Sequence, residues 1–136
     1  MITGVGMVHV WVLDQDEAYD FYVNTLGFSP HGDVRFEHMR WLSVTAPGQP
    51  DLPIALNLPL PPLMDEETVA TVRGLVAAGH MCPGGFATKD VWATYRDLKA
   101  KGVEFIGEPE QHDYGIDVGL RDPFGNHWRL TQLPAE

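Results

Sequence analysis

Hydrophobic and polar residues alternate along much of the chain with the period of two that is typical of half-buried β-strands. From Met7 to Leu13, the side chains of Met7, His9 and Trp11 fall on one face of a predicted strand, and valines occupy the other face. The same alternation returns near the end of the chain, where His127 and Arg129 share one face. Further strands are predicted at 28–36, 40–45, 51–58, 86–88 and 103–106, and in a hairpin from 114 to 131.

Helical spacing interrupts this alternation three times. The first helix is expected from Asp14, a good N-cap residue, to Leu26, and Gly27 follows it in the position of a left-handed C-terminal residue. A connecting helix follows Asp65, and a third is predicted over 90–101. The residues expected to face inward are Ala18, Tyr22 and Leu26 in the first helix, Val69, Val72 and Val76 in the second, and Val91, Tyr95 and Leu98 in the third.

The predicted elements occur twice in the same order, as strand, helix and three strands. The same number of residues separates Asp14 from Gly27 and Lys89 from Gly102, which suggests a duplicated βαβββ unit. We therefore predict one α+β domain over residues 1–136, with a first module at about 1–58, a linker helix in 59–80 and a second module at about 81–136. Two such modules would form a cupped mixed sheet with the helices on its outer side, and the concave face would accept a ligand.

Turn signals separate these strands. Asp122-Pro-Phe-Gly125 combines a residue that bonds backbone amides, a preset φ and a glycine, which predicts a tight hairpin turn. His31-Gly-Asp33 is a further turn signal, and 107–113 is predicted to be a charged loop.

Charge and cysteine content limit the partners. The chain carries 19 acidic and 9 basic residues, a net charge of −10, which argues against nucleic acids and anionic membranes as partners. No run of about 20 apolar residues is present. Cys82 is the single cysteine, so no internal disulfide can form, and a cytoplasmic protein is expected.

Three motifs occur together along the chain. They are Asp14-x-Asp16-x-Ala18 through Phe21-Tyr22-x-x-x-Leu26-Gly27-Phe28, then Leu98-Lys-Ala-Lys-Gly102-Val, and Arg121-Asp-Pro-Phe-Gly-Asn126. In combination they resemble the vicinal oxygen chelate superfamily, which includes glyoxalase I, extradiol dioxygenases, fosfomycin-modifying enzymes and bleomycin-type resistance proteins. The resemblance implies paired βαβββ modules, a cup-shaped sheet and a homodimer.

Enzymes of this superfamily hold a divalent metal with His, Glu or Gln, and the resemblance places those ligands on four positions of this chain. They are Met7, Pro83, Arg129 and a position near Leu56, with Asn57 beside it. Divalent ions in such sites bind carboxylate and imidazole donors, whereas an arginine repels them. We therefore predict neither a metal site nor a cofactor, and we assign no catalytic residue.

An enzyme of the same fold, with shifted metal ligands or with none, is the alternative. With shifted ligands, His9 and His127, with Asp117 or Glu104, would hold a metal for a lyase, a glutathione or thiol transferase, or a dioxygenase. Under the enzyme hypothesis, His9 or His127 would act as the general base.

The leading prediction is a metal-free homodimer that binds and sequesters a small, drug-sized, aromatic, antibiotic-type molecule. Methionine and tryptophan offer adaptable apolar and π surface, and Arg129 can bind a carbonyl or phenolate. Structural roles compete with this reading, because Trp11 and His9 could belong to the core and Arg129 could pair with Asp117 or Glu104. The predicted lining residues are Met7, His9, Trp11, Trp41, Leu56, Gly85, Ala87, His127 and Arg129.

Overall fold

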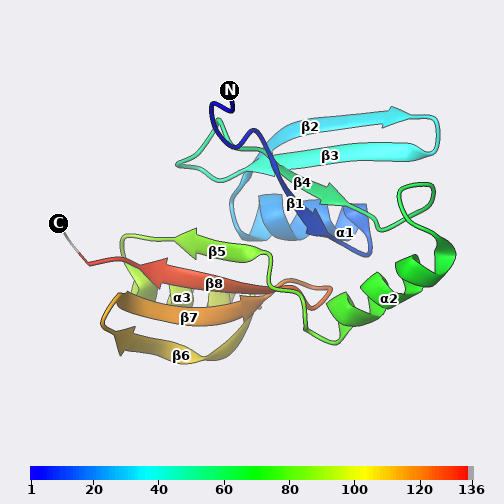
Figure 1. Cartoon of the computed structure of the whole chain (residues 1–136). Helices are drawn as coiled ribbons and strands as arrows, with labels where there is room; N and C mark the ends of the chain where they lie inside the picture. Colours follow the sequence, from blue (N-terminus) through cyan, green and yellow to red (C-terminus); the bar gives the residue numbers. More distant parts are fainter. Residues whose placement is uncertain (135–136) are drawn as a thin grey trace. The chain divides into compact units, whose positions relative to one another are not determined.

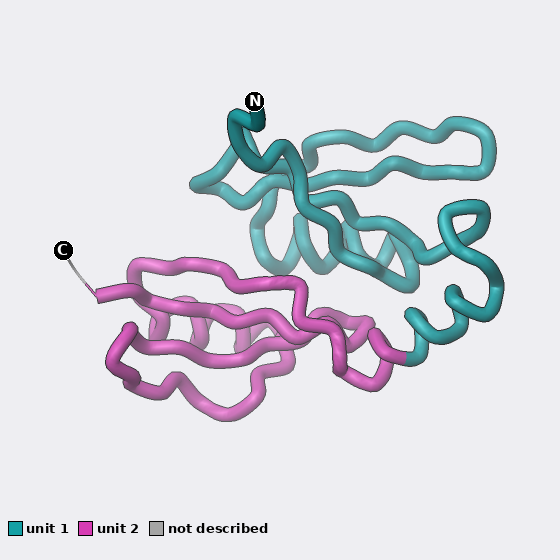
Figure 2. Tube along the Cα trace, in the orientation of Figure 1, with its two compact units in different colours: residues 1–74 teal, residues 75–136 magenta. Residues whose placement is uncertain are grey.

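Two compact units make up the chain in the computed structural model, which describes residues 1–134. The first unit covers residues 1–74 and the second covers residues 75–136 (Figure 2). Each unit contains a four-stranded mixed sheet. The predicted α+β class with two βαβββ modules is confirmed.

The first sheet has the strand order β1-β4-β3-β2 (Figure 1). Strand β1 (Val8–Trp11) runs parallel to β4 (Ile54–Asn57), which is antiparallel to β3 (Met39–Thr45), and β2 (Ser29–Phe36) forms the outer strand. One face carries apolar side chains that the intervening helical segment covers. The core of this unit contains Val10, Val12, Ala18, Phe21, Tyr22, Leu42, Val44 and Leu56.

The helical segment of the first module begins as predicted but changes its winding. Helix α1 (Gln15–Tyr19) is capped by Asp14, whose Oδ1 accepts from the Glu17 amide at 2.9 Å. The chain then continues as a π-helix, η1 (Asp20–Thr25), and ends before Gly27 with φ of 82°. The predicted helix over 14–26 therefore exists, with π-helical winding in its second half.

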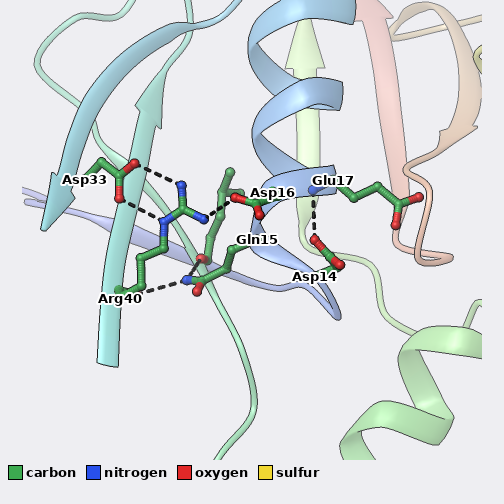
Figure 3. Close-up of polar contacts among 7 residues, drawn as sticks. Asp14, Gln15, Asp16, Glu17, Asp33 and Arg40 are labelled. Atoms are coloured by element: carbon green, nitrogen blue, oxygen red, sulfur yellow. Dashed lines mark hydrogen bonds and ion pairs between the residues drawn. The ribbon is translucent and has the colours of Figure 1, made fainter. Parts of the chain in front are cut away.

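Polar contacts tie the first turn of α1 to the sheet (Figure 3). The buried Gln15 amide donates to the carbonyl oxygens of Arg40 and Leu56, both at 2.9 Å. The Arg40 guanidinium binds Asp16 at 2.7 Å and Asp33 at 2.8 Å. These contacts fix the orientation of α1 against β3 and β4.

The second sheet repeats the first, with the order β5-β8-β7-β6. Its strands are β5 (Gly84–Ala87), β6 (Glu104–His112), β7 (Gly115–Arg121) and β8 (His127–Gln132). Helix α3 (Val91–Ala100) is capped by Asp90, whose Oδ1 accepts from the Ala93 amide at 3.0 Å. The core of this unit contains Val91, Tyr95, Leu98, Val118, Leu120, Trp128 and Leu130.

Two of the predicted boundaries are wrong. His31-Gly-Asp33 is not a turn, because it lies inside β2 at a bulge between Pro30 and Gly32. The chain turns instead at Glu37, which adopts a positive φ of 54°. Strand β6 also continues to His112 through the segment predicted as a charged loop, with a bulge between Ile106 and Glu110. A bulge shifts the side-chain alternation, which conceals the strand from a period-of-two search.

Helix α2 (Glu66–Ala77) follows β4 and leads into the second unit. Val76 is fully buried, as predicted, and Val69 and Val72 are half-buried. Within residues 1–134, no helix has the combination of length and apolar character that a membrane span requires.

Candidate ligand-binding faces

The face of the first sheet opposite its helix carries aromatic side chains from two strands. Strand register places His9 beside Ala55, and Ala55 beside Ser43. Because residues two apart on a strand share a face, Trp41 lies on the same face as Ser43 and His9. The strand register therefore places the Trp41 side chain on this face.

Three rings gather on this face. The His9 ring centroid lies 6.2 Å from that of Trp11 and 6.1 Å from that of Trp41, and the second pair meets edge to face. Met7 lies next to this group on the chain and is 37% exposed. Trp11 and Trp41 are half-buried, so part of each indole is accessible. This arrangement offers π surface and a thioether to a flat molecule.

His9 is held by Asn57. The Asn57 amide nitrogen lies 3.1 Å from His9 Nδ1, and because an amide nitrogen only donates, Nδ1 is the acceptor. The proton of the neutral ring then lies on Nε2. Asn57 Oδ1 is buried without a hydrogen-bond partner among the described residues.

Leu56 is a correction to the predicted lining. Its register partner is Val10, and both side chains are buried on the helix-covered face. The neighbouring residue on β4, Asn57, pairs with Trp11 and lies on the opposite face. A one-residue change in register exchanges the two faces of a strand, which accounts for the error.

On the second sheet, the face opposite α3 is polar at its centre and open at its edge. Gly85 pairs with Arg129, and Ala87 pairs with Thr131, so small residues lie beside the polar strand β8. His127 and Arg129 lie on this face as predicted, whereas Trp128 and Leu130 are buried under the helix.

Arg129 pairs with Asp117 across the sheet. Its Nη2 and Nε lie 2.8 Å and 3.2 Å from the same carboxylate oxygen, and that oxygen also accepts from the Tyr114 hydroxyl at 2.8 Å. His112 Nε2 lies 3.2 Å from the other oxygen. The competing partner, Glu104, instead pairs with Arg121 at 3.4 Å. The structural role that the sequence left open for Arg129 is therefore present, with Asp117 as the partner.

The charges of this group are set by opposing effects. Burial raises the pKa of Asp117, but hydrogen bonds from Arg129 and Tyr114 and the nearby cationic groups outweigh it, so the pKa lies below the ordinary value. The hydrogen bond to this carboxylate raises the pKa of Tyr114. At neutral pH Asp117 is an anion and Tyr114 a neutral donor.

His127 lies beside two guanidinium groups. Burial lowers the pKa of His127, and the charges of Arg121 and Arg129 lower it further. The ring is therefore neutral at pH 7. Its Nε2 atom is buried and has no hydrogen-bond partner among the described residues.

The donor set does not fit a divalent metal. In residues 1–134, no three His, Cys, Asp or Glu side chains are grouped so that they could hold an ion. The positions that the family resemblance assigns to ligands include a thioether, Met7, and a guanidinium, Arg129. Both carboxylates that a shifted site would use, Asp117 and Glu104, are paired with arginines.

Several polar residues on these faces were not predicted as site residues. Asn57 could have been found by correct assignment of strand parity on β4. Tyr114 and His112 carry no comparable signal, because their approach to Asp117 depends on the bulged pairing of β6 with β7.

The model of the Glyoxalase/Bleomycin resistance protein/Dioxygenase superfamily matches residues 4–130. The chain belongs to this superfamily. A superfamily model that covers nearly the whole chain agrees with the two βαβββ modules and with the resemblance carried by the two helices and the last turn.

Relatives with similar sequences and structures cover almost the full length of this superfamily member. The chain is 31% identical over 132 residues to an uncharacterised protein of Shewanella frigidimarina, covering 94% of this chain and 93% of that protein. The crystal structure of UcmS2 matches with a TM-score of 0.91 and 36% identity, covering 96% of this chain and 98% of that one. TnmS3, an antibiotic binding protein from Streptomyces sp. CB03234, matches with a TM-score of 0.77 and 31% identity over 98% of each chain.

Proposed function

We propose that this chain binds and sequesters a drug-sized, aromatic, antibiotic-type molecule without a metal ion. The observation that carries the proposal is the group of His9, Trp11 and Trp41 on the open face of the first sheet. Exposed aromatic surface beside hydrogen-bonding groups is typical of small-molecule sites. The similarity to TnmS3, an antibiotic binding protein, supports the same conclusion.

Each open sheet face supplies candidate binding residues of its own. The aromatic face supplies stacking surface, and the unpartnered Asn57 Oδ1 supplies an acceptor. On the second sheet, small residues leave space beside a neutral imidazole and a guanidinium. The residues are Met7, His9, Trp11, Trp41 and Asn57 on the first sheet, and Gly85, Ala87, His127 and Arg129 on the second.

Tryptophan fluorescence tests the proposal. The protein is titrated with fused-ring aromatic antibiotics, and we expect saturable quenching that weakens in Trp11→Phe and Trp41→Phe. Trp92→Phe is the matched control, because Trp92 lies on α3, on the side of the second sheet opposite its open face. Equal loss of quenching in all three variants, or no saturable quenching, contradicts the proposal.

Mass spectrometry separates sequestration from catalysis. After prolonged incubation with the protein, we expect the ligand to be recovered chemically unchanged. Turnover that depends on added Ni, Mn, Fe or Zn, together with stoichiometric metal binding in calorimetry, would instead favour a lyase, transferase or dioxygenase with shifted ligands.

Assembly and location complete the proposal. We infer a homodimer, so light scattering should give about twice the chain mass of 15.1 kDa, and a single-chain mass would contradict this.

We also infer a cytoplasmic location, because the exposed Cys82 thiol suits a reducing compartment. Cell fractionation tests the location.

A further inference from the structure

His127 and Arg129 both reach over the backbone of β7 at Gly119. A Cβ atom placed on Gly119 would lie 2.5 Å from His127 Nε2 and 2.9 Å from Arg129 Nη1. Both distances are too short for ordinary contact, so any other residue would displace these two side chains. The absence of a Cβ therefore allows two nitrogens from neighbouring positions on β8 to lie over the backbone of Gly119.

Neither nitrogen is satisfied by the protein. His127 Nε2 is buried and has no hydrogen-bond partner among residues 1–134. Arg129 bonds to Asp117 through Nε and Nη2, which leaves Nη1 without a partner in the described part of the chain. Buried polar atoms in native proteins almost always have partners, so an unpaired atom beside a free donor indicates a place for a ligand atom.

The chemistry of the two nitrogens favours an oxygen atom that can accept a hydrogen bond. A guanidinium only donates hydrogen bonds, whereas the imidazole Nε2 donates or accepts according to the tautomer. A hydroxyl group accepts from Nη1 and donates to Nε2, and its anion accepts from both. A cationic amine would be repelled by Arg129, and a hydrocarbon would leave both nitrogens unpaired.

From this geometry we infer that His127 and Arg129 form an oxygen-binding pair that holds a hydroxyl group, or its phenolate anion, on the aromatic ring of the ligand. This inference rests on the proposed function and names the chemical feature by which the second sheet recognises its ligand. Burial, together with the charges of Arg121 and Arg129, lowers the pKa of His127, and the same two charges favour the phenolate form of the ligand.

Asp117 and Tyr114 are positioning residues for this pair. The Asp117 carboxylate holds the Nε and Nη2 edge of Arg129, and this directs Nη1 toward Gly119. The Tyr114 hydroxyl bonds the same carboxylate oxygen at 2.8 Å and keeps it in place. Neither residue needs to touch the ligand.

A phenol and its methyl ether test the inference directly. We would record ¹⁵N amide spectra of the full chain with para-nitrophenol and with para-nitroanisole. The phenol should shift the Gly119 amide and bind about tenfold or more tightly than the ether, the size expected for hydrogen bonds to a charged group. Visible absorption should show that bound para-nitrophenol ionises at a lower pH than the free compound.

Two variants should remove this preference. In Gly119→Ala and in His127→Leu, we expect the phenol and the ether to bind within about twofold of each other. Gly84→Ala is the matched glycine control, because its Cβ would lie 3.6 Å from Trp128, an ordinary contact, and the preference should persist. Circular dichroism verifies folding, and His127→Leu tests the pair even if Gly119→Ala does not fold.

Equal binding of phenol and ether by the unmodified chain, or an unshifted Gly119 amide, overturns the inference. The tryptophan quenching experiment reports on ligand binding at the first sheet and does not depend on the comparison of phenol with ether. Quenching without a phenol preference therefore leaves the proposed function standing and removes only the oxygen-binding pair.

Discussion

At the scale of single residues, the Asp122 carboxylate organises the turn between β7 and β8. One oxygen accepts from the amides of Phe124, Gly125 and Asn126 at 2.9–3.1 Å, and the other accepts from the Asn126 side chain at 2.7 Å. Asp122 is 5% exposed, so water cannot readily replace these bonds. The turn also sets where β8 begins, and therefore where His127 lies.

Replacement of Asp122 should be costly. We expect Asp122→Ala to lower the free energy of unfolding by about 2–4 kcal/mol, because several buried amide donors would lose their acceptor. Urea denaturation measures the change. The exposed Asp113 in the preceding turn provides the control, and Asp113→Ala should change stability by less than about 0.5 kcal/mol. Similar effects for the two variants would contradict the assigned role.

His127 should make stability depend on pH. Burial and the charges of Arg121 and Arg129 lower the folded-state pKa of His127, whereas the same side chain in the unfolded protein has a pKa of about 6.5. The stabilisation that comes from the neutral His127 ring is therefore complete above the unfolded-state pKa and declines as the pH falls toward the folded-state pKa. When the pH is lowered from about 7 to about 5, we expect the free energy of unfolding to fall less in His127→Gln than in the unmodified chain. Parallel urea-derived stability curves would refute this.

At the scale of elements, the first helix of each module begins with an aspartate N-cap. Asp14 and Asp90 both lie in extended backbone and accept from the amide three residues further on. The helices then differ, because the first continues with π-helical winding and α3 remains regular. The equivalent caps support the internal duplication more directly than the weak sequence likeness does.

The cap of α3 can be compared with another aspartate of the same helix. We expect Asp90→Ala to lower the free energy of unfolding by about 1 kcal/mol, because the Ala93 amide loses its acceptor. Asp97 pairs with Lys101 at 3.3 Å on the exposed face, so Asp97→Ala should cost less than about 0.5 kcal/mol. Thermal denaturation measures both variants, and the reverse order would contradict the capping role.

At the scale of the whole molecule, acidic charge predominates. The chain carries a net charge of −10, and the basic groups placed by the structure include Arg40, Arg121 and Arg129, all paired with carboxylates. Unpaired acidic groups therefore repel one another across the surface. An anionic ligand would meet this unfavourable field, so it needs a local cation such as Arg129 to bind.

Salt should therefore stabilise the protein. We expect the melting temperature to rise as sodium chloride is increased from about 0.01 M to about 0.5 M, because the screening length falls well below typical spacings between surface charges. Differential scanning calorimetry measures the shift. A fall in melting temperature would mean that the native ion pairs outweigh the general repulsion.

Local signals predicted most of the fold. Alternation identified β1 and the hairpin, while Asp14, Asp90, Gly27 and Asp122 marked element boundaries correctly because capping and turn chemistry act over a few residues. Leu56 and the end of β6 were misassigned. Both depend on pairing with distant strands, which no short window of sequence contains.

By itself, the sequence determined the repeated order of elements and the apolar sides of β1 and β8, because periodicity and caps are local properties of a chain. Only the tertiary structure decided that Asp117, and not Glu104, receives Arg129, and that Gly119 leaves room for His127 beside it. Those outcomes depend on bulges and cross-strand register, which bring residues far apart in sequence within hydrogen-bond distance.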